Sequence, residues 1–235
     1  MSTAARPPAK RRAATPVRPD RRQNILLAAE KLFAKHGYHA VSIRHIADEA
    51  QVPLALVGYY FGAKHELYHA IFEHWSTTIN ERLAALALAM ADESGDRLPR
   101  IVEAFIAPVI RLRASAEGEY YALLMTRGLA LQSEEEDSII REFFDPMARA
   151  FIEAFHTTLA AEFPATTQAQ VVWCYQFALG ALLHHIGDRR VHRLSQGENR
   201  PNDPAVMPQL VAFIAHGMRG AMLQSHPSAP ARKEP

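Results

Sequence analysis

The stretch ILLAAEKLFAKHGYHAVSIRHIADEAQVPLALVGYYFGAKHELYHAIF, residues 25–72, decides the fold. Its apolar residues recur every three or four positions, which predicts a succession of amphipathic helices. Gly37 ends the first helix, and Pro53 fits the opening position of the third. Only Gln51 and Val52 separate the second helix from the third, so these two helices are predicted to form the compact pair of a helix-turn-helix.

The rest of the chain continues the helical pattern with short polar interruptions. Helices are predicted over residues 65–88, 98–116, 120–131, 133–162, 167–192 and 203–224, with a kink or a restart at Asp145 and Pro146. Alternating strand patterns bounded by hairpin turns are absent from the sequence. The sequence therefore predicts an all-α protein with an N-terminal three-helix helix-turn-helix head and a larger helical domain.

Composition divides the chain into four parts. Residues 1–19 are rich in Ala, Pro and Arg, which predicts a disordered basic tail, and residues 226–235 are predicted to form a second disordered tail. Between them we expect the helix-turn-helix domain over residues 20–66 and the larger helical domain over residues 67–225. Residues 1–22 hold seven Arg or Lys residues against one acid in a chain of net charge +1, which favours a polyanionic partner at the N-terminal end.

Composition also excludes several classes of protein. Cys174 is the single cysteine, so the chain can form no disulfide framework of its own. No apolar run has the length of a membrane span, and the N-terminus lacks the apolar core of a secretory signal. We therefore expect a cytoplasmic protein without a membrane partner.

The sequence offers no pattern typical of an enzyme. It contains no glycine-rich phosphate loop, no nucleophile motif and no paired carboxylates, so we predict neither catalysis nor a cofactor. His185, Asp188 and His192 share one helix face and could bind a metal. The more ordinary interpretation is a polar helix end, and we predict no metal site.

Three blocks of the opening stretch carry a resemblance to a known family. AAEKLFAKHGY, SIRHIADEAQV and YYFGAKHEL follow one another in the order and spacing of the DNA-binding head of the tetracycline-repressor (TetR) family, which the chain resembles. The resemblance covers about a fifth of the chain. It implies an all-helical homodimer with an N-terminal helix-turn-helix and a C-terminal domain for ligand binding and dimerisation.

Two residues of the predicted second helix are candidates for DNA contact. Ser42 lies at the N-terminus of this helix, where its hydroxyl and the neighbouring N–H groups suit a phosphate. Arg44 is predicted to point outward from the first turn and to contact guanine. The alternative for Arg44 is a surface salt bridge with Asp48, four residues further on.

The resemblance adds contacts to the DNA backbone. Tyr59 and Tyr60 occupy positions where the family commonly places aromatic or histidine residues against the backbone, and Lys64 matches a lysine of the family. The sequence departs from the family at Leu54 and Leu56, where residues that donate hydrogen bonds are usual. These leucines either pack on thymine methyl groups or belong to the core of the head.

Aromatic residues and a methionine of the larger domain could line a cavity for a small-molecule effector. The candidates are Phe105, Tyr121, Met125, Phe151, Trp173 and Phe177. Their proximity is implied by the resemblance, and the competing interpretation is ordinary helical core. Pro108 is predicted to kink its helix and so to open space for a ligand. Because the lining would be mostly apolar, we expect a hydrophobic effector.

These observations together predict a ligand-responsive DNA-binding regulator. As a homodimer it would bind a palindromic double-stranded operator, repress transcription, and leave the DNA when an effector binds. The resemblance also implies that the last two long helices form the dimer interface, where Ala178, Gly180 and Ala181 allow close packing. The alternative function is a helical small-molecule-binding protein without operator activity.

Overall fold

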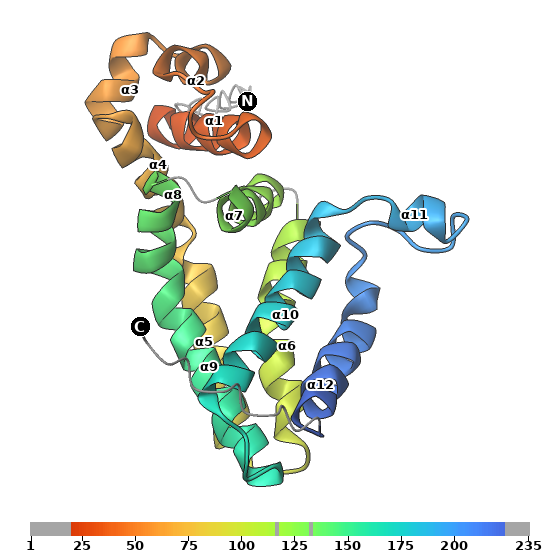
Figure 1. The fold of residues 1–235 in the computed structure, drawn as a ribbon. Coiled ribbons are helices and arrows are strands. Elements are labelled where there is room, and N and C mark those ends of the chain that lie inside the picture. The colour runs from red at the N-terminus through yellow and green to blue at the C-terminus, as the bar shows by residue number, and fades with distance from the viewer. Residues whose placement is uncertain (1–19, 116–117, 132–133, 224–235) are drawn as a thin grey trace, which may run out of the picture.

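A computed structural model describes residues 20–115, 118–131 and 134–223 (Figure 1). All regular elements in these ranges are helical, which confirms the predicted all-α class. The two tails predicted to be disordered, residues 1–19 and 226–235, lie outside the described residues, as do the last two residues of the helical domain expected over residues 67–225.

The helices divide into a small head and a larger body (Figure 1). The head consists of α1 (Arg21–His36), α2 (Ile43–Glu49) and α3 (Leu54–Phe61). The long helices of the body are α4 (Lys64–His74), α5 (Ser76–Ala91), α6 (Arg97–Ala114), α7 (Glu119–Leu131), α9 (Asp145–Glu162), α10 (Gln168–Gly187) and α12 (Met207–Leu223). Shorter elements connect them: α8 (Glu134–Ile139), the π-helix η1 (Ile140–Phe144), α11 (Val191–Leu194) and the 3₁₀ turn η2 (Pro204–Val206).

Helix α1 begins and ends where the sequence predicts. The Asp20 side chain accepts hydrogen bonds from the backbone N–H groups of Arg22 and Gln23 at 3.0 and 3.2 Å, which satisfies two unpaired donors of the first turn. The helix ends at Gly37, whose φ of +85° strains any other residue. Its inner face buries Phe33, which packs edge-on against Tyr68 of α4 with 5.2 Å between ring centroids.

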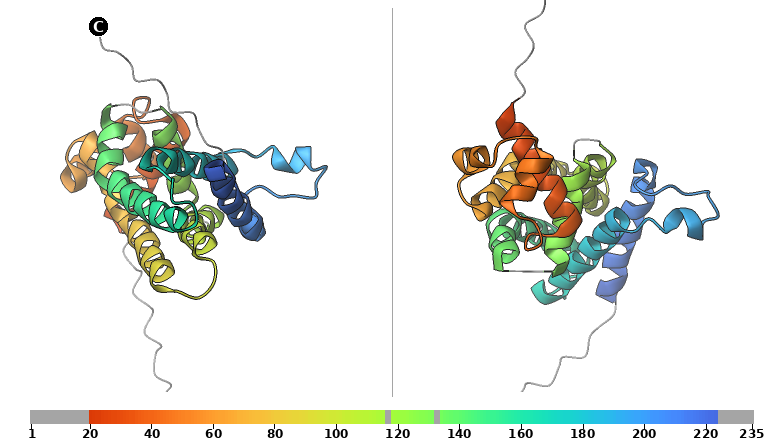
Figure 2. Two further views of the ribbon diagram at one scale, coloured as in Figure 1. Left: turned by 60° about the horizontal axis from the view of Figure 1, so that its bottom comes forward. Right: turned by 90° about the horizontal axis from the view of Figure 1, so that it is seen from above.

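The body consists of antiparallel helices beside α4, which leads out of the head (Figure 1). Helix α5 packs along α6, α12 packs along both α6 and α10, and α7 lies between α1 and the body helices. Arg219 of α12 donates hydrogen bonds to Asp96, before α6, and to Glu162, at the end of α9. The segment around α11 extends away from the body in both views of Figure 2.

Some element boundaries differ from the predictions. The helix expected over residues 65–88 is two helices that meet at Trp75, whose backbone ψ of 6° departs from helical geometry. The restart expected at Asp145 is present, because the π-helix η1 gives way there to α9. Helix α6 continues through Pro108. Helix α4 spans the boundary expected between residues 66 and 67, so the same helix serves the head and the body.

Candidate functional site

Helices α2 and α3 form an exposed pair at one end of the molecule (Figure 1). Ser42 caps α2, since its hydroxyl oxygen accepts a hydrogen bond from the His45 N–H at 3.2 Å. The His45 side chain accepts the Ser42 N–H in return, at 3.3 Å. This capping box fixes the first turn of α2 and leaves the hydroxyl hydrogen of Ser42 available to donate to a phosphate.

The Arg44 guanidinium lies on the outer face of α2. The residue is exposed, and within the described ranges it makes no ion pair with Asp48. Its donors therefore point to solvent in the structure, where a bidentate acceptor such as a guanine edge can reach them. The surface salt bridge that the sequence left open is not formed.

Helix α3 has one buried face and one exposed face. Val57 and Phe61 are buried against the rest of the head. On the outer face Leu54 is 46% exposed and Tyr59 is 80% exposed. A Cβ atom added at Gly58 would meet no atom within 4 Å. The outer face of α3 is thus apolar, aromatic and bare at its middle, so that DNA could approach its backbone closely.

The sequence did not decide whether the two leucines of α3 contact DNA or pack in the core, and the structure places them in different environments. Leu56 is half-buried and packs against the core of the head, whereas Leu54 faces solvent. The tyrosines also differ, because Tyr60 is 37% exposed and lies edge-on to Tyr59 with 5.2 Å between ring centroids. Leu54 and Tyr59 are therefore the two side chains of α3 that are best placed to meet a groove.

Lys64 opens α4 immediately after the α3 turn. Its amino group lies 4.2 Å from the centroid of the Tyr38 ring, an arrangement in which the cation interacts with the ring's π electrons. The residue is partly exposed, so the charge remains near the surface of the head. This position is compatible with the predicted contact to a DNA phosphate.

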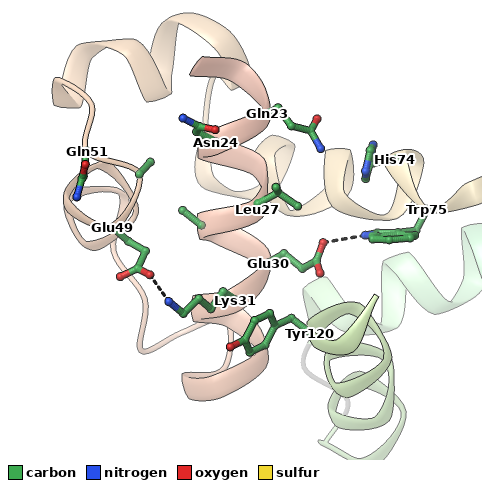
Figure 3. Close-up of a pocket in the computed structure, with 12 residues that line it drawn as sticks. Gln23, Asn24, Leu27, Glu30, Lys31, Glu49, Gln51, His74, Trp75 and Tyr120 are labelled. Carbon is green, nitrogen blue, oxygen red and sulfur yellow. Dashed lines mark hydrogen bonds and ion pairs between the residues drawn. The ribbon is translucent and has the colours of Figure 1, made fainter. Parts of the chain in front are cut away.

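A groove of about 780 Å³ separates the head from the body (Figure 3). Its walls come from α1, the end of α2, the α4–α5 boundary and α7. Glu30 of α1 lies at one side and accepts a hydrogen bond from the indole N–H of Trp75 at 2.7 Å. An ion pair between Lys31 and Glu49 joins α1 to α2. The groove therefore lies beside the contacts that fix the head on the body.

Glu30 is a buried carboxyl group at this junction. Only 1% of the residue is exposed, and burial raises its pKa to about 7, against the hydrogen bonds from Trp75 and from the Tyr121 backbone that lower it. The Trp75 indole stacks on the Tyr121 ring, with 5.2 Å between centroids and 18° between planes. Glu30, Trp75 and Tyr121 thus connect α1, the α4–α5 boundary and α7 in one set of contacts.

The structure separates the six ligand-binding candidates into two groups. Phe105, Tyr121, Met125 and Phe151 are buried in the body, and the Phe105 and Phe151 rings lie edge to face at 5.1 Å. Trp173 and Phe177 are 64% and 66% exposed on the outer face of α10 and stack on each other. They do not join the other four.

Sequence analysis missed several buried charged residues, among them Glu30 and Arg82. The side chain of Arg82 lies against Phe105 with 4.7 Å between the guanidinium carbon and the ring centroid. Each residue interrupts an apolar stripe: Arg82 lies between the buried Ile79 and Leu86 at helical spacing. A charge in the apolar stripe of a helix was the signal that could have found them.

The polar end of α10 makes ion pairs. Asp188 accepts hydrogen bonds from the Arg190 guanidinium, and these lower the pKa of its carboxyl group. The imidazole of His184 lies 3.1 Å from the same carboxylate. Among the residues with described positions, no three His, Cys, Asp or Glu side chains gather as metal ligands.

Comparison with known proteins places this geometry in a family. Residues 25–71 match the sequence model for bacterial regulatory proteins of the tetR family, and residues 103–217 match the model for the tetracyclin repressor-like C-terminal domain. Together the two matches cover more than half of the chain. The chain belongs to the TetR family. The first matched segment contains the α2–α3 pair and the second contains the buried Phe105 and Phe151.

Curated helix-turn-helix (HTH-type) transcriptional regulators match part of the chain. The transcriptional repressor NicS of Pseudomonas putida is 38% identical over 71 residues, which are 30% of this chain and 34% of that protein. The transcriptional activator FasR of Mycolicibacterium smegmatis is 34% identical over 88 residues, 37% of this chain and 40% of that protein. The aligned part of the chain thus spans about two fifths or less of these relatives.

Solved structures share the TetR fold over most of the chain. The fatty acid degradation regulator FadR from Bacillus halodurans has a TM-score of 0.58 at 16% identity, covering 86% of this chain and 98% of that one. The TetR family regulator PfmR from Thermus thermophilus has a TM-score of 0.55 at 21% identity, covering 83% and 95%. In the described parts of this chain, no helix has the length and apolar character needed to cross a bilayer.

Proposed function

We propose that this TetR-family regulator is a ligand-responsive repressor that binds a palindromic operator as a homodimer. The observation that carries the proposal is the exposed surface of α2 and α3, where Arg44, Leu54 and Tyr59 face solvent. Exposed apolar and aromatic side chains beside an exposed cation suit a DNA major groove, which offers both methyl groups and guanine acceptors.

Each side chain of this surface has a distinct role in the proposal. Arg44 contacts a base edge, and Leu54 packs on a thymine methyl group. Ser42, Tyr59 and Tyr60 donate hydrogen bonds to phosphates, and the Lys64 charge adds to the attraction. Leu56 supports α3 from the inner side.

The proposed dimer interface lies on α10 and α12. Trp173 and Phe177 of α10 and Phe213 of α12 expose 64–69% of their surfaces, a strongly apolar face for a protein in water. A groove of about 140 Å³ between Phe177 and Phe213 is lined by Ala178 and Gly217, where a partner helix could pack closely. A two-fold dimer formed here would place two α3 helices in successive major grooves, about 34 Å apart.

Effector binding in the body would act through the contacts at the head–body junction. Glu30 joins α1 to Trp75, and Trp75 stacks on Tyr121, which is buried in the body. A ligand that prefers a conformation with Tyr121 displaced would alter the orientation of α1 and therefore the spacing of the two heads. The ligand can shift this equilibrium only by its differential affinity for the two conformations.

The test is selection of binding sites from a random DNA duplex library with the full chain. We expect enrichment of an inverted repeat with salt-dependent affinity, and a loss of about 5- to 150-fold for Arg44→Ala, as for one bidentate base contact. Arg149→Ala is the matched control, because Arg149 is an exposed arginine of the body. Sedimentation of Phe177→Asp should show a monomer if α10 and α12 form the interface.

The competing function is a helical small-molecule-binding protein without operator activity. It predicts that the library yields no preferred sequence at any salt concentration and that Arg44→Ala binds random duplex as Arg149→Ala does. That result would reject the repressor proposal.

A further inference from the structure

Arg82 of α5 is a buried cation that has no anionic partner among the described residues. Only 4% of the residue is exposed, and the Nε and Nη2 atoms have no hydrogen-bond acceptor within the described chain. Buried charges in proteins are normally paired, because an unpaired one loses its hydration without compensation. A guanidinium held in this way indicates an acceptor that is supplied from outside the chain.

The surroundings of Arg82 are aromatic. The guanidinium carbon lies 4.7 Å from the centroid of Phe105 and 5.7 Å from that of Phe151, and Tyr175 packs on Phe105 at 5.4 Å. These rings attract the cation through their π electrons and offer an apolar wall. Within the described residues, none of these rings accepts a hydrogen bond from the Nε or Nη2 atom of Arg82.

Tyr121 provides a second polar group near this wall. Burial raises the pKa of its phenol, whereas the nearby Arg82 charge and a hydrogen bond with the Thr78 side chain lower it. Burial lowers the pKa of Arg82 to about 10, and the guanidinium therefore stays charged at neutral pH. A charged guanidinium with two unsatisfied nitrogens and a buried phenol therefore lie near each other in the interior of the body.

We propose that Arg82 binds the carboxylate of an apolar monocarboxylic acid, which is the effector of this regulator. The planar guanidinium fork matches a carboxylate in a bidentate pair, and one negative charge balances one buried positive charge. The rings of Phe105 and Phe151 would contact the apolar remainder of the ligand. A phosphate is a poorer match, because a single guanidinium among aromatic rings leaves its further charge and oxygens unpaired.

The interior is closed around Arg82 in the described structure, with Phe105, Phe151 and Tyr121 fully buried. The ligand must therefore bind a conformation in which one of these rings has moved. Tyr121 is the ring that stacks on Trp75 and so connects the site to Glu30 of α1. The claim that this ligand is the effector rests on the proposed function. The claim that it carries a carboxylate rests on Arg82 alone.

The experiment compares acids with their uncharged amides by titration calorimetry on the full chain. The probes are decanoate and 4-phenylbutyrate, each matched with its primary amide. We expect at least one acid to bind about tenfold or more tightly than its amide, because a charge-assisted bidentate pair is lost in the amide. Binding of both acids no more tightly than their amides would overturn the proposal.

Variants of Arg82 complete the test. Arg82→Met is expected to remove the preference for acid over amide while keeping or raising the melting temperature, since an apolar side chain replaces an unpaired buried charge. Arg82→Lys keeps the charge without the fork and should retain a reduced preference. Arg149→Met is the control for the loss of an arginine. An unchanged preference in Arg82→Met, or in Arg82→Lys if the Met variant does not fold, contradicts the proposal.

Operator binding separates this inference from the proposed function. If the ligand-free chain selects an operator but neither acid binds, the carboxylate site is wrong and the repressor proposal stands. If an acid binds through Arg82 but no DNA sequence is selected, the site stands and the repressor proposal fails. If both hold, the acid is expected to release the operator from the wild-type chain and not from Arg82→Met.

Discussion

The head and the body of this protein place arginine in opposite environments. Arg44 extends from α2 into solvent, where its charge remains hydrated until a partner arrives. Arg82 lies between aromatic rings with 4% of its surface exposed. An exposed arginine without a ligand costs the folded protein little stability, because its charge stays hydrated. A buried arginine without an anion destabilises the folded protein whenever its ligand is absent. This difference underlies the two proposals, a DNA partner that covers the head and a ligand that enters the body.

The largest expected effect distinguishes an aromatic ring of the body from one of the head. Phe105→Ala removes a ring with 0% exposure, so we expect a loss of about 3–5 kcal/mol in the free energy of unfolding. Tyr59→Ala removes a ring that is 80% exposed and should change stability by no more than about 0.5 kcal/mol. Urea unfolding of both variants measures the difference. Similar losses in the two would show that Tyr59 is buried in solution.

The second prediction concerns the pH dependence of stability at the junction of the two regions. The pKa of Glu30 is raised from 4.5 to about 7 in the folded state. The contribution of the neutral carboxyl group to the free energy of unfolding is therefore complete below pH 4.5 and is lost as the pH rises through about 7. Over that window we expect the wild type to lose up to about 3 kcal/mol relative to Glu30→Gln, which cannot titrate.

Tryptophan fluorescence can follow the same titration at the site itself. The chain has two tryptophans, and Trp173→Phe leaves Trp75 as the single reporter of the contact with Glu30. In that background the emission should change with a midpoint near pH 7, and adding Glu30→Gln should abolish the change. A midpoint near 4.5 would mean that Glu30 is not desolvated.

The third prediction tests the different environments of the two leucines of the head. Leu56→Ala should cost about 1 kcal/mol of stability, because half of the side chain packs against the core. Leu54→Ala should leave stability within about 0.5 kcal/mol and relax the base preference of the selected operator at one position. The reverse pattern would assign Leu54 to the core.

The smallest expected effect belongs to a charge cluster at the surface of the body. Arg219 pairs with Asp96 and Glu162 and lowers the pKa of both carboxyl groups. Since these groups are partly exposed, Arg219→Ala should cost only about 0.5–1 kcal/mol at pH 7. The contribution is present above the unfolded pKa values of 3.8 and 4.5 and is lost as the pH falls through the lowered folded values. A difference that persists at pH 2 would contradict an ionic origin.

The sequence predicts the head better than the body. Helix ends in the head depend on neighbouring residues, such as the Asp20 cap and the turn at Gly37, and both are visible in the sequence. The break at Trp75 was not predicted, because Trp75 is held by Glu30, which is 45 positions away along the chain. A local pattern cannot contain such a contact.

The candidate site shows the same limit for individual side chains. Leu54, Val57 and Phe61 share a stripe at helical spacing, yet Leu54 is exposed because it begins α3 and lies beyond the packed core. Trp173 and Phe177 form a second apolar stripe of α10. Periodicity shows that such a stripe exists but not whether it faces the interior or the surface of its own chain.

The empty space above Gly58 has a consequence for how such a regulator can change its target. A Cβ atom added there would meet no atom of the described protein within 4 Å, and replacement of glycine by alanine would favour the helix by about 1 kcal/mol. In the proposed complex with DNA, Asn or Arg at this position would add a group that can hydrogen-bond to a base edge at the centre of α3. Gly58 is therefore a site from which new operator specificity could evolve, or be engineered, in a single step.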